Sequence, residues 1–325
     1  MSKFQQEYKG VLLASAIGLF AYFASPWLPT YLNSILAALL LGIVIGNTIS
    51  LPESFQSGIG FTGNKLLELS ILFLAFSINY NHIAKLGAAS FAVIAATVIA
   101  MVIITYYLAI KVKCPGSTGW LVGFGTTICG SSAIAALAPS ITKNKEDVGI
   151  SMAVVNLFGS VGMIAMPFVL LKLDLNPAQM GLLLGGTLHS VGNVAGSGYA
   201  ISNEVGEAAI TIKLARVALL SPAIIFFNFL VNKNSAGNWK EHFSLPWYLW
   251  SFIGITVISS FIHFPPSFLG AMEAVGKVVL TIAMAAIGLK VSFKKLYQSG
   301  QKGLGFGLIV FAIQTIIISL LMLLL

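Results

Sequence analysis

Charged residues are scarce in this sequence. Asp, Glu, Lys and Arg together make up 9% of its 325 residues, whereas soluble domains carry roughly a quarter. Cysteine is also scarce, because Cys114 and Cys129 are the only two, too few for a disulfide framework or a cysteine-based zinc site. The HExxH and GxSxG signatures and paired aspartates are missing as well. These absences argue against a soluble domain and against an enzyme, and nothing in the sequence signals a metal or an organic cofactor.

Hydrophobic residues make up 57% of the sequence. They gather into blocks close to the length of about 20 residues with which a helix spans a bilayer core. We therefore expect an all-α polytopic membrane protein with about ten or eleven transmembrane helices, the lower number holding if one predicted span is broken. The predicted spans are 10–28, 31–49, 64–80, 87–110, 118–140, 147–171, 178–200, 205–231, 246–262, 270–290 and 303–324.

The net charge of +8 comes from lysines that lie mostly in the short connections between these blocks. They form no basic stripe with interleaved aromatic residues, so nucleic-acid binding is not expected. With strict alternation of the spans, most of the lysines fall on the side that holds the N-terminus, which predicts a cytoplasmic N-terminus. The run 10–28 after Lys3 and Lys9 resembles a secretory signal, but ten similar runs follow it, so we interpret it as a retained first helix.

Two segments of the sequence resemble each other. Residues 65–87 and 277–300 each have a lysine, an apolar span, an amphipathic tail and a closing glycine. An odd number of crossings separates the two predicted spans, as in the inverted repeats of many secondary transporters. We therefore expect one transporter domain over residues 1–325 with approximate halves 1–172 and 173–325. The alternative is that two apolar helices look alike by composition alone.

Glycine and hydroxyl residues cluster in the middle of the predicted span 118–140. Such residues weaken a helix and free backbone groups that lipid cannot satisfy, so this backbone must line a cavity or be covered by protein. If the helix restarts near Gly130, the next N–H groups form a helix N-terminus, which carries about half a positive charge and binds anions. Close helix packing through small residues is the alternative. The predicted binding residues here are Thr127, Cys129, Gly130, Ser131 and Ser132.

A second glycine-rich stretch, residues 187–199, contains polar side chains in a predicted span, and we expect a helix end near Gly192 and Asn193. His189 and Asn193 lie four residues apart and share a helix face. Polar groups at membrane depth are expensive and tend to mark substrate pathways. Both residues are therefore predicted to bind substrate, and His189 is also a candidate for proton coupling. The alternative for His189 is a packed side chain that is hydrogen-bonded to a neighbouring carbonyl.

The sequence holds a single arginine, Arg216, which lies three residues after Lys213 in an otherwise apolar span. A charge at the bilayer centre costs at least about 2.5 kcal/mol, so these side chains face a polar cavity or partner unless they snorkel to the interface. A guanidinium suits bidentate recognition of sulfate, carboxylate or phosphate. Lys213 and Arg216 are therefore predicted to bind an anion, with Glu204 and Glu207 just upstream as alternative partners.

Glu68 is the best candidate for an acidic residue well inside a predicted span. Lys65 lies three positions earlier on the same helix face and could neutralise it. A structural ion pair and a proton-coupling site are therefore both open for Glu68. The lack of paired aspartates of the kind used by cation and proton exchangers favours an anion as the cargo.

These segments resemble the YeiH-type membrane proteins, a family described as sulfate exporters and grouped with bile-acid symporters and cation:proton antiporters. The resemblance covers nearly the whole chain and implies a multi-pass protein of the bacterial inner membrane. The family pattern has an acidic residue and a later glutamine where this chain has Ser190 and Asn193, and often arginine in place of Glu68, which implies a different coupling chemistry here. The matching stretches are 35–48, 128–139, the His189 segment, 212–222 and 283–290.

We therefore expect a secondary active transporter that exports or exchanges a small anion, such as sulfate or an organic sulfonate or carboxylate. A proton-coupled cation or weak-acid antiporter centred on Glu68 and His189 is the nearest alternative. An anion channel, and an intramembrane enzyme that pairs Ser131 or Ser132 with His189, are more distant ones. The expected partners are a small anionic solute and the lipid bilayer, and the oligomeric state is left open, with a homodimer as one option.

Overall fold

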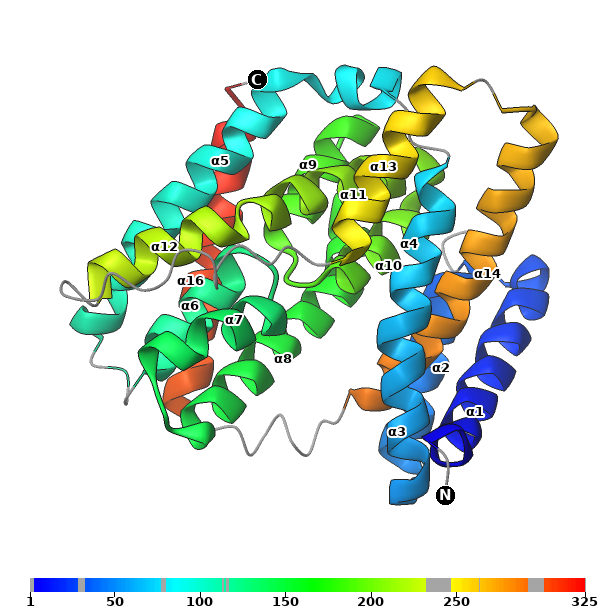
Figure 1. Cartoon of the computed structure of the whole chain (residues 1–325), viewed down its shortest axis with the longest axis horizontal. Coiled ribbons are helices and arrows are strands. Elements are labelled where there is room, and N and C mark those ends of the chain that lie inside the picture. The colour runs from blue at the N-terminus through cyan, green and yellow to red at the C-terminus, as the bar shows by residue number, and fades with distance from the viewer. Residues whose placement is uncertain are drawn as a thin grey trace. The chain divides into compact units, whose positions relative to one another are not determined.

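The structure of the chain, a computed structural model, is all-α (Figure 1). Every regular element in the part of the chain that it describes is a helix, and several of these helices are long and apolar enough to cross a membrane. The prediction of an all-α polytopic membrane protein is therefore confirmed. The structure describes residues 3–28, 33–76, 80–112, 114, 117–231, 247–262, 264–291 and 301–324.

Most of the helices overlap the predicted spans, and the elements between residues 3 and 141 include one span that is interrupted. They are α1 (Lys3–Ala24), the 3-10 turn η1 (Ser25–Trp27), α2 (Ser34–Thr48), α3 (Glu53–Phe61), the π-turn η2 (Thr62–Leu66), α4 (Leu67–Ala75), α5 (Tyr80–Lys111), α6 (Thr118–Thr127) and α7 (Ser131–Ile141).

The elements of the rest of the chain include a second interrupted span. They are α8 (Lys145–Leu170), α9 (Pro177–Thr187), α10 (Val191–Ile201), α11 (Asn203–Ala218), α12 (Leu220–Val231), α13 (Trp247–Phe261), α14 (Pro266–Lys290) and α16 (Gln301–Met322).

By length and apolarity, six described stretches qualify as membrane spans, and α11 with α12, bent by 43° at their junction, makes a seventh. Three further apolar helices, α2, α7 and α13, are shorter than a span. A count of ten or eleven crossings therefore depends on including short and broken helices. The six stretches are Glu7–Trp27, Glu53–Ala75, Gly87–Lys111, Glu146–Leu170, Pro266–Lys290 and Gly303–Met322.

The chain divides into two compact units, each assembled from separate stretches of sequence. The first unit is Met1–Lys85, Gly196–Glu207 and Trp247–Phe293, and the second is Leu86–Ala195, Ala208–Pro246 and Lys294–Leu325. The single transporter domain with halves 1–172 and 173–325, and its inverted repeat, stay predictions. Parts of the two similar segments, 77–79 and 292–300, lie outside the described residues.

In the first unit, α14 packs along α2 so closely that the contact requires glycine. A Cβ atom added at Gly42 would clash with the carbonyl oxygen of Ala285, and one added at Gly288 would clash with the carbonyl oxygen of Leu39. Small residues permit this backbone-to-backbone approach, which is how membrane helices associate without a hydrophobic driving force.

The stretch Glu53–Ala75 of the first unit begins earlier than the predicted span 64–80. The π-turn Thr62–Leu66 joins α3 to α4, so the helix continues across a segment that the hydropathy pattern excluded. The sequence of α3 is rich in polar residues and glycine, but Gly58 lets it pack directly on the backbone of α1 at Glu7 and Gly10. Tertiary packing therefore extends this helix beyond its apolar part.

Two pairs of short helices, α6 with α7 and α9 with α10, are each separated by three non-helical residues, and both breaks lie in the second unit. Both breaks lie in the glycine-rich stretches where the sequence predicts them. The end of α11 at Ala218 was not predicted. It has a local cause, because Pro222 of α12 has no N–H to donate to the carbonyl of Ala218 and its ring would clash with that carbonyl.

Candidate functional site

The first helix break, residues 128–130, leaves the start of α7 without a side-chain cap. Gly130 has φ 77° and ψ −134°, and its N–H donates to Gly125 O at 2.8 Å. The first α-helical bond of α7 runs from Ile134 N to Gly130 O at 3.2 Å. The N–H groups of residues 131–133 therefore precede the helical ladder. Because glycine stands at the N-cap position, it offers these groups no side-chain acceptor, although the Ala133 N–H interacts with the Cys129 side chain.

The second break, residues 188–190, differs from the first because the helix that follows it has a side-chain cap. Ser190 caps α10, since its Oγ accepts from Asn193 N at 3.1 Å and its carbonyl accepts from Val194 N at 3.1 Å. The helix restarts at Val191, so Gly192 and Asn193 lie in its first turn, as the sequence predicts approximately. Ser or Thr at the N-cap is the common way to satisfy a helix start. The uncapped N-terminus is therefore a property of α7 and not of α10.

Arg216 on α11 binds the carbonyl ends of both α6 and α9. Its side chain is 1% exposed, and all its hydrogen bonds run to backbone oxygens. Nε donates to Thr127 O at 2.5 Å and Nη2 donates to Thr126 O. The acceptors for Nη1 are Gly186 O at 2.7 Å, Leu188 O at 3.2 Å and Gly185 O at 3.4 Å.

Lys213 and Gln314 complete the capping of these two helix ends. Lys213 Nζ, fully buried, donates to Ile128 O and to Leu188 O, both at 2.7 Å. Gln314 Nε2 donates to Gly186 O at 2.6 Å and to Thr187 O at 3.4 Å.

With the bond from Gly130 to Gly125, every carbonyl in the last turns of α6 and α9 has a donor. The acceptors are Gly125, Thr126, Thr127 and Ile128 at the first break and Gly185, Gly186, Thr187 and Leu188 at the second. The last four carbonyls of a helix have no partner inside it and carry about half a negative charge. Lys213 and Arg216 donate to these carbonyls, so their buried ammonium and guanidinium groups are hydrogen-bonded although no carboxylate among the described residues pairs with them.

His189 lies beside this cluster. It is 1% exposed, its Nε2 is 3.3 Å from Thr126 Oγ1, and its ring centroid is 5.2 Å from that of Phe311. A Cβ added at Gly130 would lie 3.5 Å from His189 Cβ, so the histidine borders the start of α7. Its Nδ1 is buried and has no hydrogen-bond partner among the described residues. The alternative of a packed histidine bonded to a backbone carbonyl is not found among the described residues, since the Nε2 ring nitrogen of His189 is paired with the Thr126 hydroxyl.

The first turn of α7 also presents polar atoms at an accessible edge of the second unit. Ser131 is half-buried and its Oγ donates to Asn156 Oδ1 of α8 at 2.6 Å, while Ser132 is exposed. Ser132 Oγ donates to Cys129 Sγ at 2.9 Å and to Cys129 O at 3.2 Å. Two serine hydroxyls, one of them on an exposed residue, therefore lie directly at the start of α7.

Nine predicted binding residues belong to this one unit, and two helix breaks gather them. Asn193 is 6% exposed, and a Cβ added at Gly159 of α8 would clash with its Nδ2. The sequence analysis missed Gln314 and Asn156, although each is an amide side chain inside a strongly apolar helix, which was a usable signal. The nine residues are Thr127, Cys129, Gly130, Ser131, Ser132, His189, Asn193, Lys213 and Arg216.

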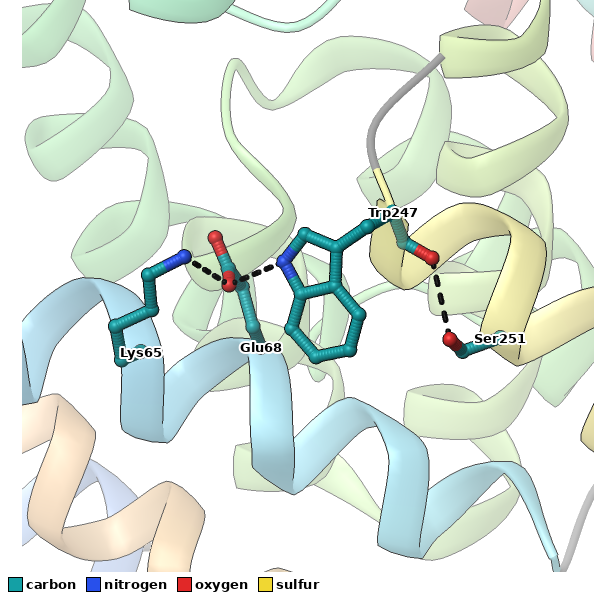
Figure 2. Close-up of polar contacts among 4 residues, drawn as sticks. All are labelled: Lys65, Glu68, Trp247 and Ser251. Carbon is teal, nitrogen blue, oxygen red and sulfur yellow. Dashed lines mark hydrogen bonds and ion pairs between the residues drawn. The ribbon is translucent and has the colours of Figure 1, made fainter.

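Glu68 belongs to the first unit and is engaged in a separate set of contacts (Figure 2). Its Oε2 is 2.9 Å from Lys65 Nζ and accepts from Trp247 Nε1 at 2.9 Å. Lys65 Nζ also lies 5.8 Å from the Trp247 ring centroid. The ion pair with Lys65 that the sequence suggests is therefore present, and the coupling role of Glu68 stays a prediction. Among the described residues, no three His, Cys, Asp or Glu side chains could together hold a metal ion.

Comparison with known proteins extends the resemblance over nearly the whole chain. The model of the family described as conserved hypothetical protein 698 matches residues 9–307. This chain belongs to that family. No solved structure matches the chain.

Three proteins with similar sequences illustrate this resemblance. A UPF0324 membrane protein of Helicobacter hepaticus is 29% identical over 96% of this chain and 95% of its own length. The UPF0324 membrane protein YdhF of Lactococcus lactis is 30% identical, over 95% and 96%. The UPF0324 inner membrane protein YeiH of Escherichia coli is 31% identical, over 86% and 82%. The predicted YeiH-type resemblance is confirmed, and the chain is a membrane-embedded protein with several transmembrane helices.

Proposed function

We propose that this protein is a secondary active transporter that exports or exchanges a small oxyanion, and that the anion binds at the first turn of α7. The observation that carries the proposal is an uncapped helix N-terminus beside two buried cations that have no carboxylate partner in the described part of the chain. The ion pairs found there, Lys65 with Glu68 and Lys277 with Glu273, involve neither cation.

The charge of the site supports an anion. Four helix ends meet at the two breaks, and each contributes about half a charge. The carbonyl ends of α6 and α9 are negative and the N–H ends of α7 and α10 are positive, so the four contributions roughly cancel. Lys213 and Arg216 then leave an excess of positive charge in a buried region, where a charge without a counterion is costly. A divalent oxyanion such as sulfate would neutralise this excess.

The hydrogen-bonding groups support an oxyanion in particular. The N–H groups of residues 131 and 132 are free of the helical ladder and point out of the N-terminus of α7, which is the usual geometry for binding sulfate, phosphate or carboxylate. The Ser131 and Ser132 hydroxyls lie in the same turn and can donate to an anion after rotating from their present acceptors. Lys213 and Arg216 donate to backbone carbonyls, so their contribution is charge rather than direct contact.

Two alternative functions have less support. An intramembrane enzyme would need a serine hydroxyl bonded to a histidine, but Ser131 donates to Asn156, Ser132 donates to Cys129, and His189 faces Thr126. A cation antiporter centred on Glu68 and His189 would need an uncompensated negative charge, and the Glu68 carboxylate is paired with Lys65. An anion channel would use the same site, and single-channel currents would establish it. The cytoplasmic N-terminus and the homodimer stay predictions.

Thermal stabilisation of the detergent-purified protein by a panel of anions tests the proposal. A ligand that binds only the folded state stabilises it by about 2.7 kcal/mol at a concentration of 100 Kd. We expect sulfate to raise the Tm more than chloride at equal ionic strength, and Arg216→Ala to abolish this shift. An unchanged shift in Arg216→Ala would remove Arg216 from the site.

Arg216→Ala also leaves several carbonyls without a donor, so a second variant is needed in case it does not fold. Asn156→Asp places a negative charge at Ser131 on the exposed side of α8 and should also abolish the sulfate shift. Asn144→Asp is the matched control, because Asn144 is exposed, lies at the N-cap of the same helix, and can be replaced there by aspartate. Loss of the shift in both variants would point to a non-specific charge effect and contradict the proposal.

A further inference from the structure

His189 lies at the start of α7, next to two glycines of the second unit. A Cβ added at Gly130, the N-cap residue of α7, would lie 3.5 Å from His189 Cβ, and one added at Gly159 of α8 would lie 3.3 Å from the same atom. Asn156 lies three residues before Gly159, on the same face of α8, and accepts from Ser131 in the first turn of α7 at 2.6 Å. The histidine therefore belongs to the part of the second unit where the proposed anion binds.

The hydrogen bonds of Thr126 determine which imidazole nitrogen carries the hydrogen. The Thr126 hydroxyl has one hydrogen and donates it to Val122 O at 2.8 Å. Its oxygen lies 3.3 Å from His189 Nε2, so it accepts from that nitrogen. Nε2 is therefore protonated, and in a neutral imidazole the other nitrogen, Nδ1, is then a hydrogen-bond acceptor.

Two cations next to His189 favour the neutral imidazole. Lys213 Nζ donates to Leu188 O at 2.7 Å, and Arg216 Nη1 donates to the same oxygen at 3.2 Å. This oxygen belongs to the peptide bond that precedes His189. Both cations would repel a positive charge on the imidazole, so Nδ1 keeps its lone pair.

Nδ1 of His189 is an acceptor without a donor. It is buried and has no hydrogen-bond partner among the described residues, and the side chain is 1% exposed. The ring lies against Phe311, with 5.2 Å between the ring centroids, and a phenyl ring has no N–H or O–H to donate. Buried polar groups normally have a partner, and leaving one unpaired is costly. The first turn of α7 offers donors to a solute, whereas His189 offers an acceptor.

We propose that His189 Nδ1 accepts a hydrogen bond from the bound solute, so that the site selects oxyanions that still carry a hydrogen. The inference rests on the proposed function, because it concerns the anion at α7. Hydrogenphosphate and sulfate are the informative pair, since both are tetrahedral and divalent but only hydrogenphosphate has an O–H group. Sulfate fits the charge of the site and leaves Nδ1 unpaired. A site that bonds a hydrogen of its substrate discriminates against an analogue without it, so sulfate is the weaker ligand.

Thermal stabilisation of the full-length protein by phosphate and by sulfate, at a mildly alkaline pH where phosphate is hydrogenphosphate, tests this selectivity. We expect the Kd for phosphate to be lower by about ten- to a hundredfold, as for one buried acceptor that is otherwise left unpaired. His189→Gln should remove the preference, because its amide can replace Nε2 but leaves no acceptor at the Nδ1 position. His189→Asn is the matched variant, since its amide oxygen can occupy the Nδ1 position and restore the preference. An undiminished preference in His189→Gln would overturn the proposal.

Replacing Thr126 tests the position of the hydrogen without changing His189. Thr126→Val removes the acceptor for Nε2–H, so the hydrogen is free to move to Nδ1 and the preference for phosphate should fall. Thr126→Ser keeps the hydroxyl and should keep the preference. In nitrogen NMR spectra of histidine-labelled protein, the signals that disappear in His189→Gln should include an unprotonated Nδ1 that shifts with phosphate more than with sulfate. A protonated Nδ1 would contradict the proposal.

The proposed function and the role of His189 fail in different ways. If neither anion raises the Tm of the wild type, the anion site at α7 is wrong, and the selectivity at His189 fails with it. If both anions raise the Tm with equal Kd values, the anion site stands and the role of His189 is wrong. If His189→Gln does not fold, the comparison of Thr126→Val with Thr126→Ser decides.

Discussion

Gly130 and Arg216 show how single residues shape this site. Gly130 has a positive φ, at φ 77° and ψ −134°, and it ends the first break and starts α7 without a side-chain cap. The Arg216 guanidinium donates hydrogen bonds to carbonyls that the two breaks leave without a helical partner. The sequence singled out both residues, because a glycine cluster and a lone arginine in apolar spans are unusual. It could not predict the acceptors of Arg216, since these are backbone oxygens about 30 and 90 residues away in sequence. The amino-acid types along the chain do not indicate which backbone oxygens will lie next to the guanidinium.

Replacing Gly130 by alanine should lower the stability of the protein by about 1–3 kcal/mol, because only glycine adopts this backbone region without strain. Space is not the obstacle, since the nearest atoms to an added Cβ are 3.5 Å away. Thermal melting followed by circular dichroism in detergent would measure the effect. Gly149→Ala in α8 is the control, because an added Cβ there meets nothing within 4 Å, and alanine in a helix should be neutral or stabilising. Equal melting temperatures for the two variants would contradict this account of the break.

At the scale of helices, the sequence predicts where apolar segments lie but not how far packing extends them. The glycine-rich breaks of α6 with α7 and α9 with α10 follow from local composition, as does the length of α8. The extension of α3 does not, because its polar sequence becomes helical against α1 through Gly58 and Gly10. The helix end at Ala218 was missed even though Pro222 is a sufficient local cause. The features that the sequence did not predict thus have one of two causes. Tertiary packing extends α3, and an overlooked proline ends α11.

The contact between α1 and α3 gives a prediction at this scale. Gly58→Ala would place a methyl group on the carbonyl of Glu7, and overpacking of this kind typically costs about 1–3 kcal/mol. Gly60→Ala, two residues later in the same helix, meets nothing within 4 Å and should be stabilising by up to about 1 kcal/mol because alanine favours a helix. The Tm values of the two purified variants should therefore move in opposite directions. A fall for both would show that this contact does not determine the position of α3.

At the scale of the whole molecule, the scarcity of charge establishes a membrane protein, and the few charges that remain divide between two different environments. In the second unit, Lys213 and Arg216 are buried among carbonyls and leave positive charge for an anion. In the first unit, Glu68 and Glu273 are paired with Lys65 and Lys277. Composition predicts the membrane environment. The burial of Lys213 and Arg216 among carbonyls could not be predicted, because it depends on which helices pack together.

The central claim is that this membrane protein moves a small oxyanion through the site at α7. The most direct measurement is counterflow of radiolabelled sulfate in proteoliposomes that hold purified protein. We expect unlabelled sulfate inside the vesicles to accelerate entry of the label, and Asn156→Asp to abolish this entry while Asn144→Asp preserves it. Absence of sulfate flux, together with sodium entry driven by a pH gradient, would contradict the claim and favour a cation antiporter.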